Sequence, residues 1–338
     1  MDRHKTHRSS RAASSRTDSV LVTGATGFIG RSLIPALRRQ GRRVIAASRN
    51  PPADEVNRAG VEWRRCDLED PRTVTAALAD IDLAYYLVHS MGTRARDFRS
   101  IEREAAASFA EAAAAAGVRR IVYLGGPEPA DRPSAHLESR LEVGRILRAG
   151  IVPTIELRAS MVVGASGAAW QIVRDLSMRL PLMVLPRWLE SRTCPVALED
   201  AIAALLAAAD ISLTSSKWFD IPGPDTLSGR EILERIAAVR GRRILALEVP
   251  LLTPRLSALW LKLVTSADFR LARELVVGLS QDLLPKDAHY WKLIGHEDRV
   301  PFELAARRAL ALERPPAEAG HRLAAFEEHL VDLAGPRA

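Results

Sequence analysis

Short apolar runs alternate with amphipathic stretches along the first half of the chain. The apolar runs predict buried strands at residues 19–24, 42–48, 61–68, 81–90, 118–126 and 152–159. The amphipathic stretches predict helices at residues 28–41, 71–80, 98–116 and 136–150. This alternation predicts an α/β fold, in which a doubly wound parallel sheet carries helices on both faces.

The alternation ends near residue 165, so we expect a second type of architecture beyond it. The sheet domain is predicted at residues 18–165, with its sheet completed by residues 193–222. A smaller, mostly helical region is predicted at residues 166–192 and 223–335. Residues 1–17 are rich in Arg and Ser, which predicts a disordered basic tail.

The composition narrows the class of protein. Apolar residues make up 47% and charged residues 26% of the 338 positions, as in soluble globular proteins, and no run of 18 apolar residues predicts a membrane span. Cys66 and Cys194 are too few for a disulfide framework, so we expect a reducing, cytoplasmic location. The net charge of +7 is diffuse outside the tail, which argues against a nucleic-acid partner. The histidines show no metal-ligand spacing, so no metal site is expected.

The stretch VTGATGFIG follows the first predicted strand and opens the first predicted helix. Its glycines have the order of a dinucleotide-binding loop: Gly24 permits a tight turn, Gly27 lets the backbone approach a pyrophosphate, and Gly30 lets the helix pack closely. The N-terminus of the helix then presents N–H groups to the phosphates. The predicted cofactor-binding residues of the loop are Thr23, Gly24, Ala25, Thr26, Gly27, Phe28, Ile29 and Gly30.

The end of the second predicted strand bears on the choice of cofactor. An NAD enzyme places an acidic residue there for the ribose hydroxyls, but this chain has Ser48 and Arg49. Arg49 could pair with a 2′-phosphate, which favours NADPH over NADH, or it could be a solvated surface residue. Asp67 and Leu68, after the third strand, could flank the adenine.

Together these residues resemble the extended and atypical short-chain dehydrogenase/reductases over about residues 18–312. TGATGFIG (23–30) is similar to that family's glycine loop, and Asp67-Leu68 matches its adenine-contacting pair. LVHSMG (87–92) and FDIPGPDTLSGREI (219–232) resemble further family elements. The resemblance implies that Val88, His89 and Ser90 lie beside the cofactor. Among its branches, it points to NAD(P)H-binding proteins related to the fungal nitrogen-repression regulator and to the accessory Rossmann subunit of respiratory complex I.

The chain departs from the family at the catalytic pair. The resemblance implies a Tyr-x-x-x-Lys pair and a Ser after the fifth strand, but no Tyr in this chain is followed four residues later by Lys. The matching positions hold His136 and Arg140, and Gly125-Gly126 stands in place of the Ser. His136 titrates near neutrality and could donate a proton, while Arg140 could hold the ribose or a substrate carboxylate. Equally, the two could be surface remnants of a lost active site.

Some candidates lie on the substrate side of the predicted sheet. From topology, we expect Gly126, Arg158, Met161, Trp170 and Trp188 to border an apolar substrate pocket. The apolar segment 245–265 could line that pocket, touch a membrane surface peripherally, or form a core helix.

Two functions fit this pattern. The first is an NADPH-dependent oxidoreductase that transfers hydride to a small apolar carbonyl or enone without the Tyr-Lys pair. The second is a non-catalytic NAD(P)H-binding sensor or assembly factor. The sequence leaves the oligomeric state open.

Overall fold

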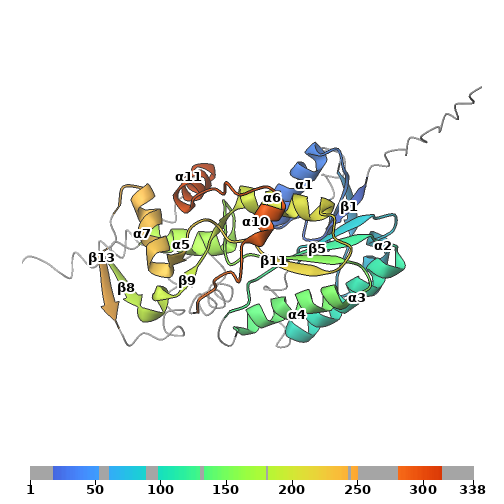
Figure 1. Ribbon diagram of the computed structural model, residues 1–338, viewed down its shortest axis with the longest axis horizontal. Helices are drawn as coiled ribbons and strands as arrows, with labels where there is room; N and C mark the ends of the chain where they lie inside the picture. Colours follow the sequence, from blue (N-terminus) through green and yellow to red (C-terminus); the bar gives the residue numbers. More distant parts are fainter. Residues whose placement is uncertain are drawn as a thin grey trace, which may run out of the picture.

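The computed structural model describes residues 18–52, 61–88, 98–129, 133–179, 182–242, 245–249 and 281–313, with only the backbone described for 179, 182–188 and 245–249. Seven parallel strands form one sheet in the order β11-β6-β5-β4-β1-β2-β3 (Figure 1). The strands are β1 (Ser19–Val22), β2 (Arg43–Ser48), β3 (Glu62–Arg65), β4 (Leu83–Tyr86), β5 (Arg120–Gly125), β6 (Thr154–Arg158) and β11 (Lys217–Asp220). The predicted doubly wound fold is therefore confirmed.

The central strands are uninterrupted apolar runs because both faces of the sheet are covered. All four residues of β1 and all four of β4 are buried. Val20 of β1 lies in register with Val44 of β2 on one side and with Leu83 of β4 on the other. The chain winds outward in opposite directions from this β1–β4 pair. In open α/β sheets, ligands bind outside the carboxyl ends of the strands at such a switch point.

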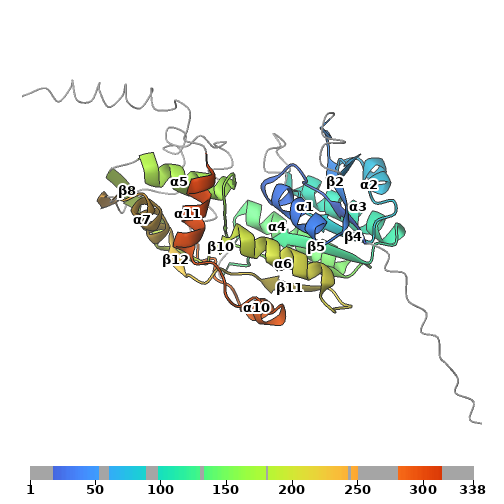
Figure 2. The same cartoon turned by 90° about the horizontal axis from the view of Figure 1, so that it is seen from above.

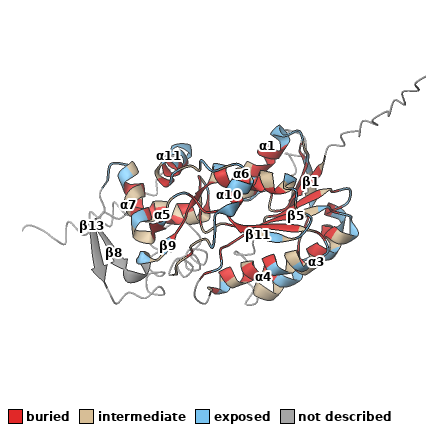
Figure 3. Ribbon diagram, viewed as in Figure 1, coloured by how far each residue is buried: buried red, intermediate tan, exposed pale blue. Residues whose placement is uncertain are grey.

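Helices cover the two faces of the sheet, as the two views show (Figures 1 and 2). One face carries α1 (Phe28–Arg39), α6 (Leu198–Asp210) and α10 (His289–Leu293). The other face carries α2 (Pro71–Ala77), α3 (Phe98–Ala115) and α4 (Ala135–Ala149). The buried sides of these helices face the sheet, and their exposed sides face away from it (Figure 3).

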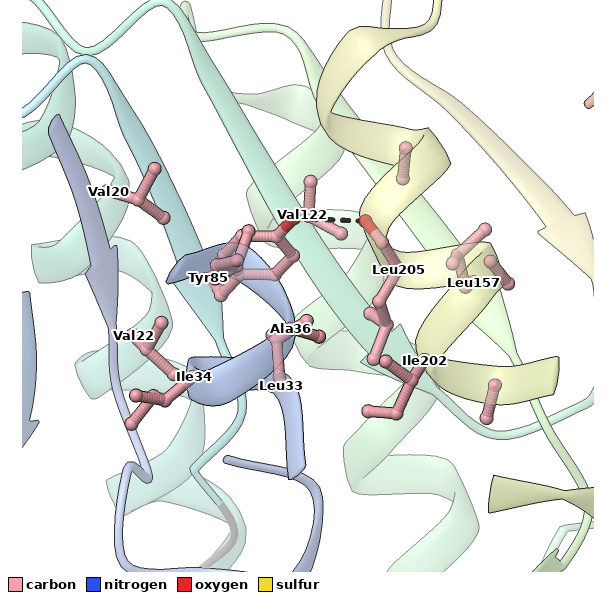
Figure 4. Packing of buried hydrophobic residues seen from close by; sticks show 14 of the residues in the cluster. Val20, Val22, Leu33, Ile34, Ala36, Tyr85, Val122, Leu157, Ile202 and Leu205 are labelled. Atoms are coloured by element: carbon pink, nitrogen blue, oxygen red, sulfur yellow. Dashed lines mark hydrogen bonds between the residues drawn. The ribbon is translucent and has the colours of Figure 1, made fainter. Parts of the chain in front are cut away.

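The core under α1 and α6 also contains the buried hydroxyl group of Tyr85. Leu33 of α1, Val122 of β5 and Leu205 of α6 pack around the ring of Tyr85 (Figure 4). The Tyr85 hydroxyl donates to the carbonyl oxygen of Leu205 at 3.0 Å. Because the group is fully buried, this bond spares the core an unsatisfied polar atom.

A smaller unit stands beside the sheet, toward the left of Figure 1. Its helices α5 (Ala168–Arg179), α7 (Gly229–Val239) and α11 (Phe302–Leu312) pack in a separate cluster around Trp170. Short strands pair within the unit: β7 (Val162–Val163) with β10 (Val196–Ala197), β9 (Arg192–Thr193) with β12 (Leu227–Ser228), and β8 (Leu182–Pro186) with β13 (Leu245–Val249). One turn of 3-10 helix, η1 (Arg187–Glu190), precedes β9.

Several predicted segments lie outside the described residues. These are the tail at 1–17, His89 and Ser90, and residues 250–265 of the apolar segment. What the sequence predicts for these residues stays a prediction. Of the helices that the structure describes, none is both long enough and apolar enough to cross a membrane.

Candidate functional site

A cavity of about 640 Å³ opens at the carboxyl ends of the central strands. Its walls come from the loop after β1, the ends of β2 to β5, and the helices α3, α4 and α5. Most of the predicted cofactor-binding residues line it: Thr23, Gly24, Thr26, Gly27, Phe28, Ile29, Gly30, Ser48, Arg49, Asp67, Leu68 and Val88. Ala25 instead points into the core under α1. The cavity is thus at the switch point where the topology favours a ligand.

The glycine loop has the geometry that its spacing predicts. Gly24 has φ +65°, and a Cβ there would lie 2.7 Å from the Leu87 carbonyl oxygen. A Cβ on Gly30 would lie 2.4 Å from the carbonyl oxygen of Gly24, so α1 packs against its own loop. Gly27 is the N-cap of α1 and makes no side-chain cap, which leaves the first turn of the helix open to a ligand.

Thr23 fixes the loop to the sheet. Its hydroxyl donates to the carbonyl oxygen of Tyr85 at 2.9 Å and accepts from the N–H of Leu87 at 3.0 Å. The side chain therefore joins the end of β1 to the end of β4, directly beneath the cavity. This gives Thr23 a structural task in addition to the predicted contact with the cofactor.

The adenosine end of the predicted site combines Arg49 with Asp67 and Glu69. Arg49 is exposed, and no other described residue pairs with its guanidinium. The N–H of Asp67 donates to the hydroxyl of Thr73 at 2.9 Å, and the carboxylate of Asp67 accepts from the N–H of Glu69 at 3.2 Å. The adjacent Cys66 also lines the cavity, but burial raises the pKa of its thiol to about 12, so it stays protonated.

The helix α4 brings His136 and Arg140 to the cavity wall, as their spacing predicts. Ser134 caps the helix by accepting from the N–H of Leu137 at 3.3 Å, which sets its first turn. The Nη2 of Arg140 donates to the carbonyl oxygen of Leu124 at 2.6 Å. The Nε of Arg140 is buried and has no hydrogen-bond partner within the described part of the chain. His136 is half-buried.

Packing explains why glycines stand at the end of β5, at Gly125 and Gly126. A Cβ on Gly126 would lie 2.6 Å from the side chain of Leu137 on α4, and a Cβ on Gly125 would lie 2.9 Å from the carboxylate of Glu156. Glu156 is fully buried in β6, where its carboxylate accepts from Arg148 at 2.7 Å and from Arg158 at 2.9 Å. This buried carboxylate occupies space beside the strand end that a larger residue would need.

The predicted substrate-side residues divide between the cavity and the core. Gly126 and Met161 line the cavity. Arg158 does not line it, because its guanidinium pairs with Glu156 and stacks 4.3 Å from the ring centre of Trp218. Trp170 is also absent from the lining: it is buried in the smaller unit and donates to the carboxylate of Glu313 at 2.8 Å. Trp188 lies in η1, and its side chain is outside what the structure describes.

Sequence reasoning did not single out two cavity residues, Glu102 and Leu283. Glu102 of α3 is buried and lines the cavity, and it accepts a short hydrogen bond from the hydroxyl of Ser139. A single acidic residue on the otherwise alanine-rich inner face of α3 was the available signal. Leu283 reaches the cavity from a segment far away in the chain, and no local pattern marks it.

Two buried tyrosines close the inner end of the cavity. The rings of Tyr86 and Tyr123 meet edge to face at a centroid distance of 5.9 Å. Burial raises the pKa of both phenols above the ordinary value of 10, and Tyr123 already donates to the carbonyl oxygen of Arg140 at 3.0 Å. The phenol of Tyr123 is therefore directed at the backbone of α4. In the described part of the chain, no three His, Cys, Asp or Glu side chains gather as metal ligands would.

The proteins and the family model that this chain resembles are consistent with a nucleotide site at the glycine loop. Residues 24–178 match a family model described as NAD(P)H-binding. The chain is 25% identical to the NAD(P)H azoreductase of Xenophilus azovorans over 67% of this chain and 75% of that protein. It is 28% identical to the ceramide reductase of Caulobacter vibrioides over 68% of this chain and 73% of that protein.

Among solved structures, the fold is similar to that of the Citrobacter sp. triphenylmethane reductase complexed with NADP(H). The TM-score is 0.69 at 19% identity, and the match covers 86% of this chain and 99% of the other. The expected relation to the fungal nitrogen-repression regulator and to the complex I subunit stays a prediction. The glycine loop, the switch-point cavity and the family match together identify residues 24–178 as an NAD(P)H-binding domain.

Proposed function

We propose that this protein is an NADPH-dependent oxidoreductase that reduces an apolar carbonyl or enone without a Tyr-Lys pair. The observation that carries this proposal is the single continuous cavity. The same cavity is lined by the glycine loop, by the polar turn of α4, and by apolar side chains that include Met161 and Ile172. A site that holds both a nucleotide and an apolar group next to a titratable side chain suits hydride transfer.

The residues at the cofactor end fit an NADP(H) molecule. The uncapped first turn of α1 offers N–H groups to the pyrophosphate, and Gly27 adds no side chain in their way. Arg49, exposed at the end of β2 where an NAD enzyme has an acid, favours the 2′-phosphate of NADPH. When bound, NADPH would supply a hydride from nicotinamide C4 to the substrate carbon.

His136 and Arg140 take the remaining tasks in this proposal. Reduction of a carbonyl requires one proton on the substrate oxygen, and the imidazole of His136, or a water beside it, donates that proton. The buried Nε of Arg140 is a donor that lacks a partner among the described residues, so a ribose or substrate oxygen at that point would satisfy it. The Nη2 bond to Leu124 holds the guanidinium in place for this contact.

A binding protein that senses NAD(P)H is the second candidate. The absence of Tyr-x-x-x-Lys from the whole sequence favours it, since the cofactor loop alone would serve a sensor equally well. The names of the relatives favour the first candidate, because two of those compared are reductases.

The two candidates can be separated by kinetics. NADPH oxidation would be followed with a panel of apolar ketones, enones and quinones. We expect turnover of at least one class, and a kcat about a hundredfold lower in His136→Ala with unchanged NADPH affinity. His289→Ala is the matched control, because His289 is exposed on α10 and does not line the cavity. Tight NADPH binding without turnover of any substrate would favour the sensor.

A further inference from the structure

Leu283 reaches the cavity from the segment that precedes α10. Its side chain is 7% exposed and packs against Leu137 and Leu141 of α4. Leu137 and Leu283 both line the cavity, and Leu137 directly follows His136. A residue from the C-terminal part of the chain therefore forms apolar wall beside the turn that carries the proposed proton donor.

The backbone around Leu283 is fixed to the smaller unit. The N–H of Leu283 donates to the carbonyl oxygen of Arg192 at 2.8 Å, and Leu283 forms a parallel bridge with Thr193 of β9. The carboxylate of Asp282 accepts from the N–H of Arg192 at 2.7 Å. These contacts attach Leu283, and Asp282 directly before it, to strand β9.

A second attachment ties the same segment to the main sheet. The N–H of Lys286 donates to the carboxylate of Asp220, at the end of β11, at 2.6 Å. The ammonium group of Lys286 pairs with Glu128, in the loop after β5, at 2.7 Å. The segment around Leu283 is thus attached to β9 of the smaller unit and, at Lys286, to the main sheet. These two attachments fix the position of the Leu283 side chain against α4.

We propose that Leu283 determines how large an apolar group of the substrate the cavity accepts. The inference rests on the proposed function, since it concerns the substrate of that same site. Leu137 and Leu283 of the cavity wall pack with Leu141 in an apolar cluster, so the group that lies against it is an uncharged alkyl or aryl chain. Shortening Leu283 to a methyl group would extend the cavity toward Leu141 and admit a longer chain.

The test uses alkyl phenyl ketones from propiophenone to octanophenone with the full chain loaded with NADPH. Ketone binding is read from the fluorescence of the bound NADPH, and turnover from NADPH oxidation. In Leu283→Ala, we expect the preferred chain length to increase by two or three carbons, with about tenfold tighter binding of the longer ketones. In Leu283→Phe, the preference should shift to shorter chains. Leu304→Ala, at a position 41% exposed on α11, is the control and should keep the wild-type profile.

The outcomes separate this inference from the function on which it rests. Thermal melting of each variant confirms that it folds, and Leu283→Phe supplies the result if Leu283→Ala does not. Identical chain-length profiles in the wild type and the folded Leu283 variants would overturn the role of Leu283 alone. A wild-type protein that binds NADPH but none of the ketones would overturn the proposed substrate class, and the inference with it.

Discussion

Tyr123 and Arg140 connect strand β5 and helix α4 in both directions. The hydroxyl of Tyr123 donates to the carbonyl oxygen of Arg140 at 3.0 Å, while the guanidinium of Arg140 donates to the carbonyl oxygen of Leu124 at 2.6 Å. The bond from Arg140 to Leu124 fixes the end of β5, and the bond from Tyr123 to Arg140 fixes the N-terminal part of α4, which carries His136. The position of the proposed proton donor therefore depends on a tyrosine that does not act in the chemistry.

Tyr123→Phe should destabilise the fold by about 1 kcal/mol, because it removes one buried hydrogen bond and keeps the packing of the ring. Urea denaturation measures this change. Tyr85→Phe is the matched comparison on the opposite face of the sheet, where the hydroxyl bonds to Leu205 at 3.0 Å. Only Tyr123→Phe should also alter kcat. An unchanged kcat in Tyr123→Phe would contradict the role in positioning α4.

Gly24→Ala should abolish measurable binding of NADPH. The new Cβ would meet the Leu87 carbonyl oxygen at 2.7 Å while the backbone has φ +65°, so the loop must move away from the phosphates. Gly41→Ala has a similar φ of +76° but nothing near the added carbon, so it should cost only about 1 kcal/mol of stability. Calorimetric titration of both variants would show whether the crowding at Gly24, rather than φ alone, matters for binding.

Arg49→Ala should weaken NADPH binding by at least about tenfold and leave NADH binding nearly unchanged, since a charged contact to phosphate contributes roughly 1.5–3 kcal/mol. Dissociation constants for both cofactors at one fixed salt concentration provide the measurement. Arg308→Ala on α11, paired with Glu199, removes the same charge far from the cavity and serves as control. Equal losses for the two cofactors would refute the assignment of the 2′-phosphate to Arg49.

Glu156→Gln should destabilise the protein by about 3 kcal/mol, because it leaves the buried guanidinium of Arg158 without its main counter-charge. Glu62→Gln, which breaks ion pairs of a carboxylate that is 40% exposed, should cost less than about 1 kcal/mol. Chemical denaturation of the two variants gives the comparison. Similar costs at the two positions would mean that burial does not strengthen the Glu156 cluster.

Asp220 should make stability depend on pH. Burial, partly offset by the N–H bond from Lys286, raises the pKa of this carboxyl above its ordinary 3.8. The folded protein then holds the proton more tightly than the unfolded chain does, so this group favours folding more as the pH falls toward 3.8. The unfolding free energy of wild type minus that of Asp220→Asn should therefore increase between pH 7 and pH 4. A difference that decreases on acidification would show that the contacts of the carboxylate outweigh its burial.

The sheet and the glycine loop could be predicted from the sequence because their signals are local. Apolar runs of strand length, glycine stops such as Gly41, and the spacing of Gly24, Gly27 and Gly30 each depend on neighbours within a few residues. The same holds for His136 and Arg140, since a separation of four residues places two side chains on one face of any helix.

The direction of side chains that depend on contacts between segments could not be predicted in this way. Trp170 and Arg158 were expected at the pocket from topology. Trp170 instead donates to Glu313, far along the chain, while Arg158 pairs with Glu156, two residues before it on β6, and stacks on the distant Trp218. Leu283 was missed for the converse reason, since its place depends on pairing with β9, more than eighty residues earlier in the chain. Such pairings depend on tertiary packing, which periodicity does not encode.

The buried carboxylate of Glu156 also constrains how this sequence can change. Two arginines hold it in the space that a Cβ at Gly125 would enter at 2.9 Å and a Cβ at Gly144 would enter at 2.5 Å. A serine introduced at position 125 would therefore be unfavourable until Glu156 is replaced, and replacing Glu156 alone leaves a buried cation uncompensated. The glycines and the carboxylate are thus mutually dependent, and a return to the serine of the resembled family requires coordinated substitutions rather than a single one.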